Sequence, residues 1–257
     1  MKRKLKANII WSGFALTKQW KIIEPKDYTS THKEYNIDGK KYIRVTRSLS
    51  IIGKPGLMSW FASKGRKACD KIIENRQNLG TKVHKLIELK LKRKPLYLNK
   101  LPKDAFGEEV RLDMKLFAAF NKEAELEAEG LEQHLWSNKY RYAGTADFIG
   151  HYLTPIRFLV RGHKAKFLKS SLVIGDWKTS ANIYPEYWLQ LAAYAMAFYE
   201  LTGIKVDGVF IVQFRYGRVK VKEKTWDELV TLFEAYKHAL ALYQWKYPNW
   251  DKKEVKK

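Results

Sequence analysis

Cysteine is almost absent from the sequence, since Cys69 is the single cysteine among 257 residues. One thiol excludes a disulfide within the chain, a zinc site of four cysteines and an iron–sulfur cluster held by cysteine ligands. Chains without disulfides are typical of reducing compartments. We therefore expect an intracellular protein that carries no iron–sulfur cluster.

Long apolar runs are lacking as well. The most apolar stretch, residues 189–199, is far shorter than the ~20 residues that span a bilayer. The basic residues 1–6 are not followed by the apolar run and small-residue cleavage site of a signal peptide. The phosphate-binding loop Gly-x-x-x-x-Gly-Lys-Ser/Thr is absent too. We expect no membrane partner, no signal peptide, no ATP motor and no nucleotide cofactor.

Acidic residues are scarce in the first part of the chain. The whole sequence has 49 Lys and Arg against 27 Asp and Glu, a net charge of +22. Residues 1–103 hold 26 of the basic residues and 7 of the acidic ones, and residues 148–175 contain no acid. A solvated surface has no reason to be so uneven, so this distribution indicates a nucleic-acid partner. The candidate DNA contacts are Arg66, Lys67, Lys82, Lys85, Arg161 and Lys164.

Hydrophobic and aromatic residues are plentiful, at 46% and 14%, so the chain can fill a core. The length fits one large domain or one domain with an appended lobe. The change in charge divides the chain into a basic lobe, residues 1–103, and a core, residues 104–257. We expect the two parts to form one compact unit.

Local patterns predict an α/β fold. Asp38-Gly39 predicts the turn of a hairpin over residues 35–43, and helical periodicity covers 46–92 with breaks at Pro55 and near Gly80. A helix over 106–128 is expected to end at Gly130. The remaining predicted elements are strands 132–137, 140–152 and 172–179, a helix over 185–201, strands 206–214 and 219–222, and a helix over 226–247.

One apolar strand ends in a carboxylate and an ammonium group, Asp176 and Lys178. Because side chains alternate along a strand, both project to one face and Trp177 faces away. This arrangement places a metal ligand beside a cation that could orient a water or a phosphate. The acid-x-Lys pattern recurs in this lysine-rich chain, so a simple salt bridge at the strand end is the alternative.

Asp147 lies inside another apolar, strand-like run. A lone buried carboxylate requires a partner or a metal ion. A divalent cation held by Asp147 and Asp176 would satisfy both carboxylates. The alternative is that Asp147 caps a bend at Gly144-Thr145.

Residues of three further helix or strand segments could complete such a site. His84 and Glu88 are four residues apart and share a helix face, so Glu88 could orient His84 or could pair with Lys92. Glu132 opens the strand expected beside that of Asp147 and is either a further carboxylate ligand or a solvated strand end; His134 shares its face. Gln190 and Tyr194 share a helix face, and either flank the metal pocket or lie on the helix surface.

Together these motifs resemble the PD-(D/E)XK nuclease superfamily, in particular its RecB-type exonuclease branch. The matching order, over residues 80–194, is Gly80-Thr81-x-x-His84, Gly144-Thr145-x-Asp147, Asp176-x-Lys178-Thr179 and Gln190-x-x-x-Tyr194. Residues 45–46 and 54–60 resemble the helical lead-in of phage and viral members. Ala146 departs from the proline in the superfamily's name, at a position that varies.

The resemblance implies a restriction-endonuclease-like core, a mixed central sheet flanked by helices, and phosphodiester hydrolysis that depends on one or two Mg²⁺ or Mn²⁺ ions. Carried over to this chain, it implies that the metal ligands are His84, Asp147, Asp176, the Trp177 carbonyl and, less directly, Glu132. Lys178 would orient or activate the attacking water. Gln190 and Tyr194 match the fourth motif of the branch.

The substrate is expected to be linear or single-stranded DNA, or duplex ends, cleaved by an exonuclease. A structure-selective endonuclease or resolvase, a non-catalytic DNA-binding protein and an RNA-binding protein are the alternatives. Aromatic residues of the basic lobe, Trp11, Trp20 and Trp60, could stack on bases or belong to the core. Members of the family usually act in replication, recombination or repair. This setting does not identify a particular helicase or recombination partner.

Overall fold

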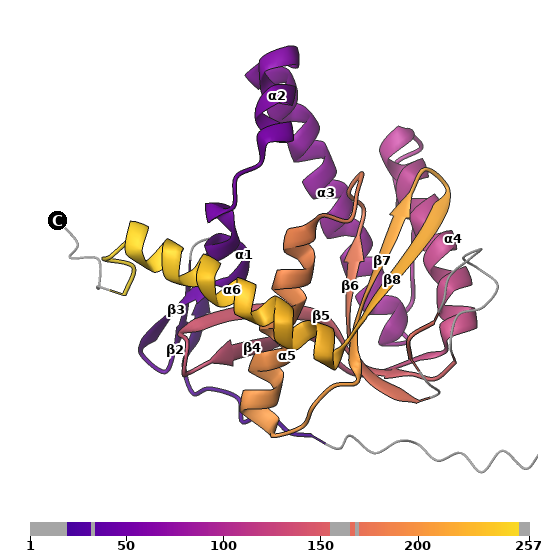
Figure 1. The fold of residues 1–257 in the computed structure, drawn as a ribbon. Coiled ribbons are helices and arrows are strands. Elements are labelled where there is room, and N and C mark those ends of the chain that lie inside the picture. Colours follow the sequence, from indigo (N-terminus) through magenta and orange to yellow (C-terminus); the bar gives the residue numbers. More distant parts are fainter. Residues whose placement is uncertain (1–19, 32–33, 155–164, 168–169, 252–257) are drawn as a thin grey trace, which may run out of the picture.

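The protein has an α/β fold in which helices flank a mixed sheet (Figure 1). The computed structural model describes residues 20–31, 34–154, 165–167 and 170–251. Within these ranges the sheet has eight strands in the order β1-β2-β3-β5-β6-β7-β8, with β4 paired to β5. Trp11 and the predicted DNA contacts Arg161 and Lys164 lie outside the described residues.

The first three strands pair as antiparallel neighbours, with a hairpin between the second and the third, and join the main sheet. They are β1 (Tyr28–Ser30), β2 (Glu34–Ile37) and β3 (Lys40–Arg44). Asp38 and Gly39 both have positive φ, 47° and 73°, so the predicted tight turn is confirmed. Strand β3 pairs in parallel with β5. The hairpin therefore belongs to the same sheet as the rest of the chain.

A helical region follows: α1 (Val45–Ser48), η1 (Leu49–Ile51), α2 (Pro55–Lys64), α3 (Arg66–Leu91) and the short η2 (Leu98–Lys100). Figure 1 shows α2 and the first part of α3 projecting away from the sheet. The break at Pro55 is confirmed, because Pro55 opens α2. The break near Gly80 is wrong, since α3 runs through it. A side chain there would lie 3.3 Å from Thr179 Oγ1, so Gly80 lets the helix pack closely against the end of β6.

Helix α4 (Ala105–Ala124) ends earlier than the predicted boundary at residue 128. Its C-cap, Glu125, is left-handed, with φ 49° and ψ 57°. The chain then enters β4 (Leu126–Ser137), whose first residue is opposite Tyr152 of β5. Residues 126–129 alternate polar and apolar, and residues 126–128 pair with β5 before the register shifts between Ala128 and Gly130. Gly130 consequently lies inside a strand and does not end the helix.

The remaining elements agree in type with the sequence prediction. They are β5 (Tyr142–Tyr152), β6 (Ser171–Lys178), α5 (Pro185–Thr202), β7 (Gly208–Arg215), β8 (Arg218–Thr225) and α6 (Trp226–Lys246). Strands β6 and β7 are parallel and connected by α5, whereas β4–β5, β5–β6 and β7–β8 are antiparallel.

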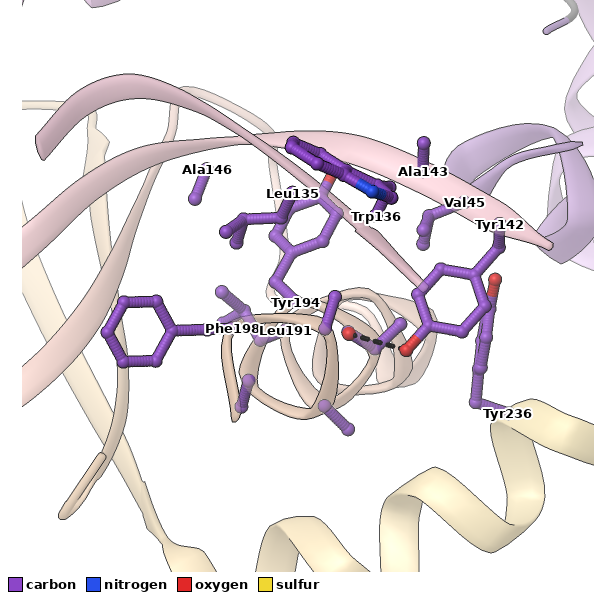
Figure 2. Close-up of a cluster of buried hydrophobic side chains, with 14 of the residues drawn as sticks. Val45, Leu135, Trp136, Tyr142, Ala143, Ala146, Leu191, Tyr194, Phe198 and Tyr236 are labelled. Atoms are coloured by element: carbon purple, nitrogen blue, oxygen red, sulfur yellow. Dashed lines mark hydrogen bonds between the residues drawn. The ribbon is translucent and has the colours of Figure 1, made fainter. Parts of the chain in front are cut away.

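The sheet has a hydrophobic core on each face. Alternate residues of β6 reach the two sides: Ile174 packs with α5 and α6, and Val173 packs with α3 and α4. Figure 2 shows the first of these cores, where residues of β4 and β5 face Leu191, Tyr194 and Phe198 of α5. Trp20 is 4% exposed and packs on Phe198, so of its two predicted roles the structure supports the core.

Candidate active site

The end of β6 carries the acid and the lysine that the sequence singles out. Lys178 Nζ lies 2.7 Å from Asp176 Oδ2, so the two side chains share a face as predicted. Trp177 points to the opposite core and is packed among Phe117, Phe210 and other rings. The alternating pattern of a strand thus anchors the site through a buried tryptophan while presenting two charged groups.

His84 and Asp147 meet at the backbone of Trp177. The Trp177 N–H donates a hydrogen bond of 3.0 Å to Asp147 Oδ2, and the Trp177 carbonyl lies 2.7 Å from His84 Nε2. The other ring nitrogen, Nδ1, is 3.3 Å from Asp147 Oδ2. Three residues from α3, β5 and β6 therefore converge, and the Asp147 carboxylate lies at this junction.

Electrostatics couple these groups. Burial opposes protonation of His84, but the charge and hydrogen bond of Asp147 outweigh it and raise the His84 pKa to about 9. Burial likewise opposes ionisation of Asp147, yet the neighbouring His84 and Lys178 hold its pKa below the usual range. At neutral pH the pair is thus an imidazolium beside a carboxylate.

Glu132 joins this pair. One ligand atom from each of His84, Glu132 and Asp147 lies within 4.8 Å of the other two, a spacing that could hold a metal ion. Although Glu132 is exposed as a residue, partial burial of its carboxyl and the charge of Asp147 raise its pKa to about 7. A divalent cation would relieve this repulsion between carboxylates.

Glu132 also has an unusual backbone. Its φ is 51°, in the left-handed region, although its neighbours Leu131 and Gln133 pair with β5. Such a conformation is strained for a residue with a side chain and often marks functional positions. No local pattern predicted this conformation, because the predicted strand started at Glu132.

Asp176 lies outside the three-residue group, with its carboxylate held by Lys178. Burial raises the Asp176 pKa to about 6, with Lys178 opposing the shift and Asp147 adding to it. Burial works against the charge of Lys178, but Asp176 and then Asp147 raise its pKa overall. Lys178 therefore remains protonated at neutral pH, beside both carboxylates.

The donor set fits a hard divalent cation. Three carboxylates, one imidazole and the Trp177 carbonyl provide mainly oxygen ligands, which suit Mg²⁺ and Mn²⁺. The close spacing of the ligand atoms of His84, Glu132 and Asp147, together with the buried carboxylate of Asp176, is the observation behind this fit.

Helix α5 contributes the next group of residues. Gln190 Nε2 donates a hydrogen bond of 3.1 Å to the Tyr194 hydroxyl, which confirms the predicted shared helix face. Tyr194 is buried against Gly144, while Gln190 is half-buried. Sequence reasoning missed Tyr187, whose ring centroid lies 4.4 Å from Lys178 Nζ. Tyr187 precedes Gln190 by three residues and Tyr194 by seven, so it shares their helix face. This spacing was the signal available in the sequence.

The predicted basic contacts lie along α3. Arg66, Lys67, Lys82 and Lys85 are exposed, and the last two flank His84 in sequence. Lys85 and Lys92 form ion pairs with Glu88 at 2.7 and 2.6 Å. Of the two roles predicted for Glu88, pairing with Lys92 is therefore the one observed.

A second polar network connects β4 and β5 to the first three strands. The His134 Nδ1 atom is 3.0 Å from the Tyr28 hydroxyl and 3.1 Å from Thr145 Oγ1. Tyr35 connects Thr145 to Arg44, with its hydroxyl 3.3 Å from Thr145 Oγ1 and accepting a hydrogen bond of 2.8 Å from Arg44. The predicted partner strand thus places His134 in a hydrogen-bonded network, outside the three-residue group.

Comparison with known proteins adds little. No protein-family model and no curated protein matches the chain. Among solved structures, it is similar to one titled "Crystal structure of SSO0001", at 17% sequence identity and a TM-score of 0.28, over 51% of this chain and 57% of that chain. A TM-score of this size carries no argument about function. Among the described helices, none is both long and apolar enough to cross a membrane.

Proposed function

We propose that the protein is a metal-dependent deoxyribonuclease of the PD-(D/E)XK type, acting as an exonuclease on linear or single-stranded DNA. The observation that carries this proposal is the convergence of His84, Asp147 and Glu132 at the end of β6, next to the pair of Asp176 and Lys178. We further propose that the mixed sheet corresponds to a restriction-endonuclease-like core.

Each residue has a distinct task in this proposal. His84, Glu132, Asp147, Asp176 and the Trp177 carbonyl would hold Mg²⁺ or Mn²⁺. The ion would supply Lewis-acid stabilisation of the phosphate and lower the pKa of a bound water.

Lys178 carries the positive charge nearest to these carboxylates. Held between Asp176 and the Tyr187 ring, it is positioned to orient a water or a phosphate oxygen by hydrogen bonding. The exposed basic residues along α3 provide contacts to the DNA backbone that do not depend on sequence.

The test is hydrolysis of end-labelled linear DNA and covalently closed circular DNA in Mg²⁺, Mn²⁺ or EDTA. We expect loss of the linear DNA in either metal and none in EDTA. Lys178→Ala removes the positioning cation, so turnover should fall by at least about a hundredfold while DNA affinity is nearly unchanged. Asp147→Asn should abolish both hydrolysis and Mn²⁺ binding measured by calorimetry.

The matched control is Lys224→Ala. Lys224 lies on β8 and, like Lys178, is half-buried and forms a salt bridge. This variant should retain full hydrolysis. Nicking of the closed circle would indicate an endonuclease. Tight DNA binding without hydrolysis of either substrate would refute the nuclease and favour a binding protein.

A further inference from the structure

A groove of about 470 Å³ opens beside the candidate site, a volume typical of ligand pockets. One wall is the start of α5, with Glu186, Tyr187 and Gln190. The opposite wall is the segment from α1 to α2. Its lining includes Leu49, Ile52, Leu57 and Met58.

The groove adjoins the site at Tyr187 of α5. Tyr187 lines the groove, and its ring lies 4.4 Å from Lys178 Nζ. Gln190 lines it as well and donates its hydrogen bond to Tyr194. A strand whose phosphate reaches Lys178 therefore has this groove within reach of an adjoining nucleotide.

The groove walls combine apolar surface with charge at the rim. Leu57 and Met58 are 38% and 67% exposed, and exposed apolar side chains around a groove indicate a ligand contact. Lys54 Nζ lies 3.1 Å from Glu186 Oε1. This ion pair keeps the Lys54 ammonium group at the rim of the groove. Such a surface fits the apolar face of a flat ring that is attached to an anionic backbone.

We propose that this groove binds one unpaired nucleobase of the strand held at the Lys178 end of β6. The inference rests on the proposed nuclease function and specifies its substrate as single-stranded. Aromatic and apolar side chains stack on any base, because every base has a π face, so binding is independent of sequence. A paired base is enclosed by its neighbours in the duplex and must leave the stack to enter. Intact duplex is therefore excluded until its end frays.

The experiment measures binding and hydrolysis separately. Binding of a labelled oligothymidylate of about fifteen nucleotides, a length near the largest single-strand site sizes, is measured in Ca²⁺ beside a fully abasic strand and a duplex of equal length. We expect the abasic strand and the duplex to bind about tenfold more weakly, in line with the contribution of base stacking. In Mg²⁺ or Mn²⁺, the normal strand should also be cleaved faster than the duplex.

A substitution in the groove identifies the contact. Met58→Ser should weaken binding of the normal strand and leave binding of the abasic strand unchanged, because the lost contact is to a base. The matched control is Ile72→Ser, which removes an exposed apolar side chain of α3 that is not part of the groove lining. Ile72→Ser should not change the binding of either the normal or the abasic strand. Both positions are exposed, so neither change threatens folding.

The two proposals fail in different ways. Equal binding of the normal and abasic strands, or an equal effect of Met58→Ser on both, would overturn the base groove even if DNA is hydrolysed. Absence of metal-dependent hydrolysis would overturn the nuclease, whereas base-dependent binding sensitive to Met58→Ser would still support the groove.

Discussion

The imidazole of His84 contacts an oxygen atom on each side. Its Nδ1 faces Asp147 at 3.3 Å, and its Nε2 faces the Trp177 carbonyl at 2.7 Å. Since a carboxylate and a carbonyl both accept hydrogen bonds, both nitrogens must donate, consistent with a pKa raised to about 9. A nitrogen that ligates a metal must first lose its proton. Proton and metal ion would therefore compete for His84.

Gly144 shows how closely the residues beside the site are packed. A Cβ atom at this position of β5 would lie 2.3 Å from Cε1 of Tyr194, whose hydroxyl accepts the Gln190 hydrogen bond. Gly144→Ala must therefore displace Tyr194. Overpacking of this kind lowers the free energy of unfolding by about 2 kcal/mol, which urea denaturation would measure.

The control for this prediction is Gly56→Ala in α2, where an added Cβ meets nothing within 4 Å. We expect that variant to be as stable as the original protein or slightly more stable, because alanine favours a helix. An unchanged urea midpoint for Gly144→Ala would show that the ring moves without penalty.

Residue spacing alone predicted several features of the candidate site. The two-residue period of a strand gave the shared face of Asp176 and Lys178, because that period is purely local. The positive φ of Glu132 and the Tyr187 contact with Lys178 depend on tertiary packing. No local pattern predicts the positive φ of Glu132. The helical spacing of Tyr187 from Gln190 was a signal for their shared face, but the contact with Lys178 itself depends on packing.

At the scale of elements, α6 begins with a capping box. The side chain of Thr225 and that of Glu228 satisfy each other's backbone groups at the helix start. Glu228 also forms ion pairs with Lys166 and Lys224, at 2.7 and 2.8 Å. Partial burial opposes its ionisation, but these hydrogen bonds outweigh burial and lower its pKa to about 2.

Glu228→Gln keeps the capping geometry and removes the charge. Because the pKa of Glu228 is lowered on folding, its ionised form stabilises the native state above its unfolded pKa of about 4.3, and this contribution disappears as the pH falls through 2. We expect the variant to be less stable by about 1 kcal/mol at pH 7. The difference in thermal unfolding should shrink between pH 4 and pH 2, both approximate limits set by these pKa values.

Glu234→Gln on the same helix is the matched control. Its carboxylate also pairs with a lysine, Lys237 at 2.7 Å, but it is 57% exposed. Exposed pairs contribute little to stability, so this variant should unfold like the original protein at every pH. A constant difference between Glu228→Gln and the original protein across pH would contradict the role given to the Glu228 charge.

Helix ends were the least predictable elements. Helical periodicity continued past residue 124, yet the chain turns at Glu125 into a strand, because residues 126–128 pair with β5. Conversely, Gly80 suggested a break where packing against Thr179 keeps α3 continuous. In both cases tertiary contacts override local preference.

For the whole molecule, the pairing of β4 with β5 was predicted, but the order of the other strands in the sheet was not. The parallel pairing of β3 with β5 joins residues about a hundred positions apart, Ile43 and Tyr142 among them. Element types follow from local periodicity, whereas such pairing depends on which buried surfaces fit together. One sheet includes strands from both the basic lobe and the core. The division of the chain at residue 103 therefore remains a prediction that rests on charge alone.

The uneven charge of the whole molecule gives the last prediction. Phosphate contacts release counterions, so DNA affinity should fall steeply with salt if the +22 charge serves DNA binding. Lys82, exposed on α3 two residues before His84, is expected to contact one phosphate. Lys82→Gln should then reduce the slope of log affinity against log salt by about 0.7 for a single strand.

Lys115→Gln is the matched control, because Lys115 is also exposed on a helix but belongs to α4 in the nearly neutral part of the chain. It should leave the salt slope unchanged. Fluorescence anisotropy at several salt concentrations measures the DNA affinity of the original protein and of both variants. A flat salt dependence of the original protein would contradict backbone binding, and equal slopes for the two variants would mean that the Lys82 face of α3 does not contact the DNA.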